Sequence, residues 1–302
     1  MEPPIVTFGP EGCGKTTILK QAAHMLRKLG YEVFYLNPLE REFLVEVDDA
    51  DIKTLFFDFI RQTFSDEIWG RVVFGAIDLV RELLKRRKKK VAILADDVFQ
   101  AIGLNKAAMY VNGLLGIIEY PPGEYEGVVA LAATGEGVSR WEIGRHRWAE
   151  LRPMWNIVRE GFVQLYEKVP GPKPPFEDVW KMAGGNPWMI AKLYMADRDV
   201  RRVVSDFIQE KWLPSAFVEK WRRWLVEAVE DPDVLWDPDA PEELINELTS
   251  RNLIVYMMYP RDSYFWIDQP PPERDLEIGV GEHVAWHSPL HREAVKAVLN
   301  NA

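Results

Sequence analysis

The sequence predicts an α/β protein in which a parallel β-sheet occupies the first half of the chain. Near-continuous apolar runs end at Phe8, Asn37, Ala95 and Thr134, and the segments between them carry apolar residues at helical spacing. Strands that are apolar on both faces and alternate with helices are typical of a parallel sheet with helices on both sides. From Ser215 onward this alternation ends, which indicates a different C-terminal domain.

The elements of the first half follow one another in a regular order. The first strand is the run IVTF, and the helix after it, KTTILKQAAHMLRKLG, has apolar residues three and four positions apart and ends at Gly30. The segment 39–65 fits neither pattern clearly. The remaining expected elements are a strand at 31–38, a helix at 68–84, a strand at 91–95, a helix at 107–118 and a strand at 128–134.

The second half is expected to be mainly helical. The proline-rich stretch VPGPKPPF at 169–176 is a connector, and two paired helices flank the turn at Gly184 and Gly185. The later elements are a helix at 217–229, a helix at 242–251, a strand at 252–259, a turn at 260–263, a strand at 264–268 and a closing helix at 288–299. A helix that leads into a strand-turn-strand unit resembles a winged helix. The expected domains are an α/β core at 1–168, a helical lid at 169–214 and a winged-helix-like domain at 215–302.

Composition narrows the class of protein. The 302 residues include one Cys, which excludes a disulfide framework, and no uncharged apolar stretch is long enough to cross a membrane. We therefore expect a soluble, cytoplasmic protein without a membrane partner. The formal net charge is −10, and residues 215–302 hold 8 Lys and Arg against 17 Asp and Glu. Such a balance disfavours contact with nucleic-acid phosphates and favours a protein partner for the C-terminal domain.

A glycine-rich stretch, GPEGCGKTT at residues 9–17, lies between the first strand and the first helix. Its spacing fits G-x-x-x-x-G-K-[ST], the pattern of a loop that turns its backbone N–H groups around a phosphate chain. Positions without a Cβ allow that turn, and Lys15 would place its ammonium near the β- and γ-phosphates. The Thr16 hydroxyl would join the shell of a Mg²⁺ ion. The expected nucleotide-binding residues are Gly9, Pro10, Glu11, Gly12, Cys13, Gly14, Lys15, Thr16 and Thr17.

Two carboxylates, Asp96 and Asp97, follow the buried strand at 91–95. In a parallel sheet the carboxyl ends of the strands form the edge where ligands bind, and the glycine loop emerges from the same edge. We assign Asp96 to Mg²⁺, while Asp97 would orient the attacking water or accept its proton. In the alternative interpretation, the Asp pair only ends the strand and caps the next helix.

Four motifs occur together: GPEGCGKTT at 9–17, VAILADD at 91–97, VVALAAT at 128–134 and GGNPWMIAKL at 184–193, of which the first two have the Walker A and Walker B patterns. With them the chain resembles the archaeal ATPases of the AAA-like, STAND-related group. The resemblance implies a P-loop nucleoside triphosphatase core with a helical lid, ATP as the ligand and Mg²⁺ as the cofactor. It also implies that Thr134 senses the γ-phosphate and that Asn186 and Pro187 contact the nucleotide. Relatives usually carry Glu where this chain has Asp97, whose side chain is one methylene shorter.

The segment SRWEIGRHRWAELRPMW at 139–155 is dense in arginine. The resemblance implies that an arginine of this region reaches the γ-phosphate, often across a subunit boundary, and stabilises the charge of the departing phosphoryl group. We assign this role to Arg145 or Arg147 without separating them, and the trans arrangement would make the protein a homo-oligomer. The alternative interpretation is a solvated turn.

Three functions remain open at this point. The first is an ATP-binding and ATP-hydrolysing switch or motor, with Lys15, Asp97 and one arginine in catalysis. The second is a nucleotide-gated binding module with little turnover, and the third is a DNA-docking ATPase of the replication-initiator type, which the charge disfavours. Cys13, the single cysteine, is either a reactive thiol that bound nucleotide would cover or a small buried packing residue.

Overall fold

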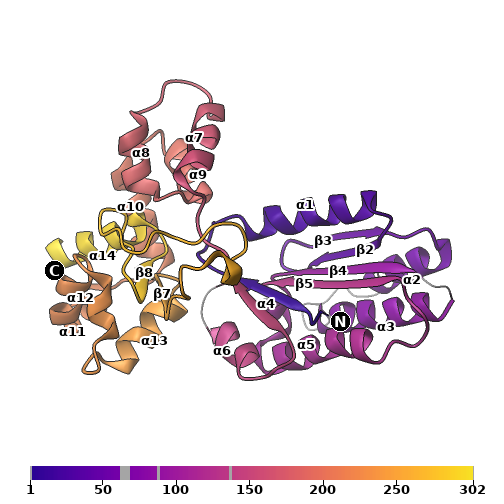
Figure 1. The fold of residues 1–302 in the computed structure, drawn as a ribbon. Coiled ribbons are helices and arrows are strands. Elements are labelled where there is room, and N and C mark those ends of the chain that lie inside the picture. Colours follow the sequence, from indigo (N-terminus) through magenta and orange to yellow (C-terminus); the bar gives the residue numbers. More distant parts are fainter. Residues whose placement is uncertain (1, 62–68, 87–88, 136–137, 302) are drawn as a thin grey trace. The chain divides into compact units, whose positions relative to one another are not determined.

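The computed structural model describes residues 2–61, 69–86, 89–135 and 138–301 (Figure 1). Contacts between residues divide the chain into two compact units. The first unit contains the residues up to Phe8 and Lys15–Arg152, and the second contains Gly9–Gly14 and Pro153–Ala302. The glycine loop therefore belongs, by its contacts, to the unit formed by the C-terminal half of the chain.

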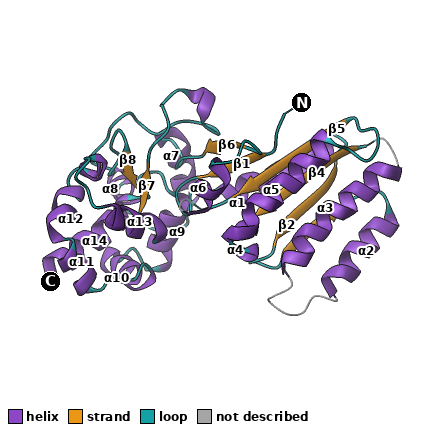
Figure 2. Ribbon diagram, turned by 90° about the horizontal axis from the view of Figure 1, so that it is seen from below, coloured by secondary structure: helices purple, strands orange, loops and turns teal. Residues whose placement is uncertain are grey.

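The first unit is built on a six-stranded sheet in the order β3-β2-β4-β5-β1-β6 (Figure 2). Strands β2, β4, β5 and β1 pair in parallel, whereas β3 is antiparallel to β2. The strands are β1 (Ile5–Phe8), β2 (Glu32–Asn37), β3 (Glu42–Glu46), β4 (Lys90–Asp96), β5 (Gly127–Ala133) and β6 (Glu150–Pro153). The expected α/β fold with a mostly parallel central sheet is confirmed.

Helices cover both faces of this sheet because its central strands are apolar on both sides. Helix α1 packs on one face, where Leu19 and Ala23 meet Tyr35 and Leu94. The other helices include α3 and α5 on the opposite face, and their apolar side chains share a larger core with the alternate strand residues (Figure 1). The helices are α1 (Lys15–Lys28), α2 (Ala50–Arg61), α3 (Trp69–Arg86), α4 (Val98–Ile102), α5 (Leu104–Glu119) and α6 (Val138–Gly144).

Most elements expected in the first half are found, and the ambiguous segment 39–65 holds β3 and α2. The first residue of one expected helix, Ile68, lies outside the described residues. Strand β3 is only five residues long and begins and ends with Glu, so its apolar pattern is too short to read. Strand β6 carries Glu and Arg and ends in Pro153, so it lacks the apolar run that would predict a strand.

The second unit is mainly helical and has one principal apolar core, which extends from Phe162 to Leu299. Trp286 lies fully buried in it, and its indole N–H donates to the Ala228 carbonyl at 3.1 Å. Its helices are α7 (Arg159–Lys168), α8 (Phe176–Ala183), α9 (Pro187–Met195), α10 (Val200–Glu210), α11 (Ser215–Lys220), α12 (Arg222–Ala228), α13 (Glu242–Ser250) and α14 (Pro289–Asn301), with 3₁₀-helices at Pro232–Trp236 and Ser263–Phe265. The boundaries at 168 and 214 stay predictions.

The predicted strand-turn-strand unit at 252–268 is wrong in its second strand. Strand β7 (Ile254–Tyr256) pairs with β8 (Val284–Trp286), antiparallel, and not with residues 264–268. The guanidinium of Arg261 instead donates to the carbonyls of Tyr259, Pro272 and Gly281, which fixes a long connection between the two strands. The winged-helix assignment stays a prediction. Among the described residues, no helix combines the length and the apolar character that crossing a membrane requires.

Candidate functional site

The glycine loop Gly9–Gly14 connects the end of β1 to the start of α1. Its three glycines have φ values of +154°, +78° and +109°, which side chains with a Cβ rarely adopt. Two of them are also crowded: a Cβ on Gly9 would lie 1.9 Å from the Met154 carbonyl oxygen, and one on Gly12 would lie 2.4 Å from the Trp188 Cβ. Glycine is therefore required here by packing within the second unit, in addition to any need for phosphate binding.

Cys13 is fully buried, with 0% of its surface exposed. Its backbone N–H donates to the Pro10 carbonyl at 3.2 Å, which closes a tight turn inside the loop. Of the two interpretations of this cysteine, the structure supports the small packing residue over the accessible thiol.

Lys15 and Thr16 are the first residues of α1, a helix of 14 residues. The first turn of a helix has backbone N–H groups without helical partners, and it is the positive end of the helix dipole. The first turn of α1 contains no acidic residue that would neutralise this end. The position favours an anion, as the sequence pattern predicts.

The register of the parallel strands brings the predicted carboxylates to one edge of the sheet. Thr7 of β1 pairs with Ala133 of β5, and Ala133 pairs with Asp96 of β4. Thr134 follows on β5, is buried, and donates its N–H to the Thr7 carbonyl at 2.9 Å. The structure therefore brings Asp96 and Thr134 to the same carboxyl edge from which the loop leaves β1.

Asp96 is buried, and two side chains from the neighbouring strand β2 hold it. The Tyr35 hydroxyl donates to its Oδ2 at 3.0 Å, and the Asn37 amide Nδ2 donates to the same oxygen at 3.2 Å. Burial, and then the charge of Asp96, raise the pKa of Tyr35, so this hydroxyl stays protonated and keeps the proton that it donates to Asp96. Sequence reasoning missed Tyr35 and Asn37, although polar side chains at alternate positions of a buried strand are a signal that could have found them.

Asp97 has a left-handed backbone, with φ of +50°, at the position before α4. Its side chain makes no capping hydrogen bond to that helix, so the interpretation as a simple helix cap is not supported. A left-handed non-glycine residue costs about 1 kcal/mol or more, and such strain collects at functional sites. The backbone turns sharply at Asp97 after the strand, and the role of its carboxylate in hydrolysis stays a prediction.

The two candidate arginines lie at the C-terminal side of α6, and both are exposed. Arg145 pairs with Glu142 at 2.5 Å, and its side chain remains 64% exposed. Arg147 makes no ion pair with any residue that the structure describes. Arg140 differs from both: it is buried and stacks over the ring of Phe8, 4.6 Å from the centroid. It therefore has a packing role that the exposed pair lacks.

Asn186 is fully buried at the start of α9, and its side chain is saturated with hydrogen bonds. Its Oδ1 accepts from the N–H groups of Trp188 and Met189, at 3.0 and 3.3 Å. Its Nδ2 donates to the Glu11 carbonyl and to the Asn156 Oδ1, both at 2.8 Å. Asn186 thus holds the glycine loop to α9, and Pro187, half-buried beside it, keeps its predicted contact with nucleotide as a prediction.

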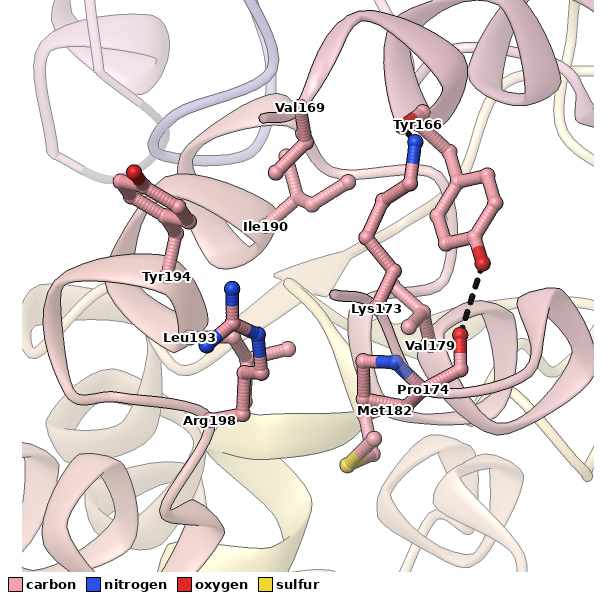
Figure 3. Close-up of a pocket in the computed structure, with 10 residues that line it drawn as sticks. All are labelled: Tyr166, Val169, Lys173, Pro174, Val179, Met182, Ile190, Leu193, Tyr194 and Arg198. Carbon is pink, nitrogen blue, oxygen red and sulfur yellow. Dashed lines mark hydrogen bonds between the residues drawn. The ribbon is translucent and has the colours of Figure 1, made fainter. Parts of the chain in front are cut away.

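The second unit also contains an apolar pocket between α7, α8 and α9 (Figure 3). The Tyr166 hydroxyl donates to the Pro174 carbonyl at 2.7 Å, while Lys173 and Arg198 lie among the residues that line it. None of the residues that line it belongs to the glycine loop or is one of the predicted site residues. The pocket is therefore not part of the candidate site.

Comparison with known proteins gives one family. A family model described as an ATPase domain predominantly from Archaea matches residues 1–193. Among solved structures, the Walker-type ATPase PABY2304 of Pyrococcus abyssi is 14% identical, with a TM-score of 0.46 over 98% of this chain and 91% of that chain. A search of curated proteins found no match. The family match includes the glycine loop, both aspartates and the Asn186–Pro187 pair.

Proposed function

The chain belongs to the family of ATPase domains found predominantly in Archaea, and we propose that it is a nucleotide-dependent switch that binds ATP with Mg²⁺ at the glycine loop and hydrolyses it. The observation that carries the proposal is the start of α1 at Lys15, directly after a loop of three glycines at the carboxyl end of β1. A positive helix end, a lysine and a turn of backbone N–H groups together form a binding site for a phosphate chain.

The oxygen donors at the site suit a magnesium ion. Mg²⁺ prefers carboxylate and hydroxyl oxygens and binds through few protein ligands, and Thr16 and Asp96 are of these types. They would hold the ion, which supplies positive charge beside the β- and γ-phosphates. Tyr35 and Asn37 orient the Asp96 carboxylate through Oδ2, and partners of this kind commonly set the affinity of a ligating carboxylate.

Hydrolysis needs a group that orients water and a group that stabilises the leaving charge. Asp97 would orient the water or accept its proton, and Thr134 would contact the γ-phosphate. Arg145 or Arg147 would supply the stabilising charge from a second copy of the chain. Their exposure supports this trans arrangement, because a buried arginine could not reach another subunit.

A binding module with little turnover is the second candidate. Asp97 favours it, because a carboxylate one methylene shorter than Glu reaches less far and a 1 Å misplacement can cost about a hundredfold in rate. In that version ATP would change the contacts of the C-terminal region with a protein partner. A DNA-docking role is disfavoured by the excess of acidic residues in 215–302.

Lys15→Ala tests the site, with Lys28→Ala, an exposed lysine in the last turn of the same helix, as the matched control. We expect Lys15→Ala to weaken ATP binding and turnover about 100-fold or more, and Lys28→Ala to change neither. Binding is measured by titration and turnover by phosphate release, at equal Tm. ATP binding by Lys15→Ala at the strength of the unchanged chain would rule out the site.

Three further variants test the roles of single residues at the site. Thr16→Ala should mainly change the Mg²⁺ concentration at which turnover is half-maximal, because the hydroxyl is a metal ligand. Asp97→Asn should abolish turnover and keep ATP binding, and unchanged turnover would show that Asp97 does not act in hydrolysis. An Arg145→Ala, Arg147→Ala double variant mixed with Lys15→Ala should regain activity if the arginine acts in trans, and the absence of rescue would exclude that arrangement.

A further inference from the structure

Lys211 is a buried cation whose partner lies in the glycine loop. It follows the last residue of α10 and is 9% exposed. Its ammonium donates to the carboxylate of Glu11, which stands 200 positions earlier in the chain. A buried ammonium needs a paired anion, since an unpaired one is strongly destabilising. Both residues belong to the second unit, so this ion pair ties the loop to the end of α10.

The main chain of Glu11 is held on both sides as well. Its N–H donates to Nδ1 of His287 at 3.2 Å, and its carbonyl accepts from Nδ2 of Asn186 at 2.8 Å. Asn186 and His287 are themselves linked through Asn156, whose amide bonds the Asn186 side chain and the His287 carbonyl. The N–H, the carbonyl and the carboxylate of Glu11 are all engaged, so this residue is the point at which the loop is fixed.

Lys211 is in turn a firm anchor. Its N–H donates to the Phe207 carbonyl at 2.8 Å, and its carbonyl accepts from Nη1 of Arg251 at 3.0 Å. His291 lies near it and has a pKa lowered well below the usual value, first by burial and then by the charges of Lys211 and Lys192. The imidazole therefore stays neutral and adds no second positive charge beside Lys211.

We propose that Lys211 is a positioning residue for the phosphate-binding loop, which acts through Glu11 to keep the loop in the conformation that receives the phosphate chain of ATP. This inference rests on the function proposed above. A loop that is held needs no further ordering when the ligand arrives, whereas a loop that samples other conformations binds in proportion to its competent fraction. If that fraction fell to about one tenth, the apparent Kd would rise about tenfold.

The Lys192–Glu210 pair provides a matched control. It also joins a lysine with little exposure to a half-exposed glutamate, at 12% and 50%, and it involves the same helix α10. Glu210 precedes Lys211 directly, but among the described residues neither member of this pair forms a hydrogen bond or an ion pair with Glu11. Loss of either lysine should lower Tm to a similar degree, so the two variants separate loop positioning from general stability.

The test is ATP binding by titration, at a temperature well below the Tm of every variant. Lys211→Met should raise the Kd for Mg-ATP about tenfold with kcat changed less than about twofold, and Lys211→Arg should restore the Kd. Glu11→Gln should raise the Kd to a similar degree. The double variant should bind ATP no more weakly than the single variant with the higher Kd, because both substitutions remove the same contact. Lys192→Met should leave the Kd within about twofold.

Several outcomes would overturn the inference. These are an unchanged Kd in Lys211→Met, tighter binding in that variant, or an equal loss in Lys192→Met. If Lys211→Met does not fold, Glu11→Gln carries the test, since its side chain is 47% exposed and its main-chain bonds remain. Lys15→Ala measured in parallel separates failure of the proposed ATP site from failure of the positioning role. If Lys15→Ala binds ATP normally, the site assignment is wrong. If Lys15→Ala loses binding and Lys211→Met binds ATP normally, only the positioning role of Lys211 is wrong.

Discussion

Asp96 and the glycine loop, the two features that the sequence identifies most clearly, are held by hydrogen bonds from different parts of the chain. Asp96 accepts hydrogen bonds from Tyr35 and Asn37, which lie 61 and 59 positions away in a neighbouring strand. The loop is held through Glu11 by Asn186 and His287, which lie 175 and 276 positions away. The carboxylate thus depends on the sheet, whereas the loop depends on the folded C-terminal half.

This difference means that the two features should respond to damage separately. Changes near the sheet should affect the carboxylate and leave the loop in place. Changes in the residues that pack on the loop should affect phosphate binding first, although they lie far from it in the sequence. The following variants test the comparison, from the largest expected effect to the smallest.

Gly9→Ala should be the most damaging change. The new Cβ would lie 1.9 Å from the Met154 carbonyl oxygen, at a φ of +154° that alanine rarely adopts. We expect a loss of about 3 kcal/mol or more in the free energy of unfolding, with loss of ATP binding. Gly30→Ala is the control: its φ is +83° and no atom lies within 4 Å, so backbone strain of about 1 kcal/mol is the only expected cost.

Denaturant unfolding of both variants gives the measurement. If Gly9→Ala were no more destabilising than Gly30→Ala, the close packing of the loop against the segment that follows Arg152 would be disproved.

Tyr35→Phe should weaken the carboxylate and spare the loop. The change removes the hydroxyl that donates to Asp96, and loss of such a partner costs about 10- to 100-fold in metal affinity or activity. The Mg²⁺ dependence of turnover should therefore shift, while the Kd for ATP without Mg²⁺ stays the same. Tyr110→Phe is the control, because the Tyr110 hydroxyl is buried and has no hydrogen-bond partner among the described residues.

Tyr110→Phe is expected to keep full turnover and to be as stable as the unchanged chain or slightly more stable. Equal losses in the two tyrosine variants would show that the Tyr35 hydroxyl does not act through Asp96.

His291, which lies near Lys211, should make the free energy of unfolding decrease at acidic pH. His291 is neutral in the folded chain, because burial and then Lys211 and Lys192 lower its pKa well below 6.5. The unfolded chain binds a proton near pH 6.5, so this contribution is present above that pH and is lost as the pH falls below it. The slope should reach about 1.4 kcal/mol per pH unit and should decrease in His291→Gln.

His283→Gln is the control for this pH dependence. His283 is stacked on Trp236, and its side chain is 42% exposed. The unfolding free energy is followed from pH 7 to pH 5. A slope reduced equally by both substitutions would mean that His291 is not the group responsible.

Cys13 should give the smallest signal. Because its thiol is fully buried in the loop, a thiol reagent should modify the native chain very slowly, with or without ATP. In denaturant, one equivalent should react, since the chain has one Cys. Rapid labelling of the native chain, slowed by Mg-ATP, would instead show that the loop opens and is not held as the structure indicates.

The central strands could be predicted because their signal is local. A run such as VAILAD is apolar on both faces, and only a strand between two helical layers can bury it. The same reasoning failed for β3 and β6, because these edge strands are short and carry little apolar pattern. It also failed for residues 264–268, because strand pairing depends on partners far along the chain. Strand β7 pairs with Val284–Trp286, and local sequence does not indicate this.

The sequence by itself determined the phosphate-loop pattern, the strand-end aspartates and the alternation of strands and helices, because each is encoded in residues a few positions apart. Only the tertiary structure decided which side chains support them. Tyr35 and Asn37 meet Asp96 through strand register, and Glu11 meets Lys211 across 200 positions. The physical reason is that a buried charge takes whichever partner the packing brings within hydrogen-bond distance, and local sequence carries no record of that partner.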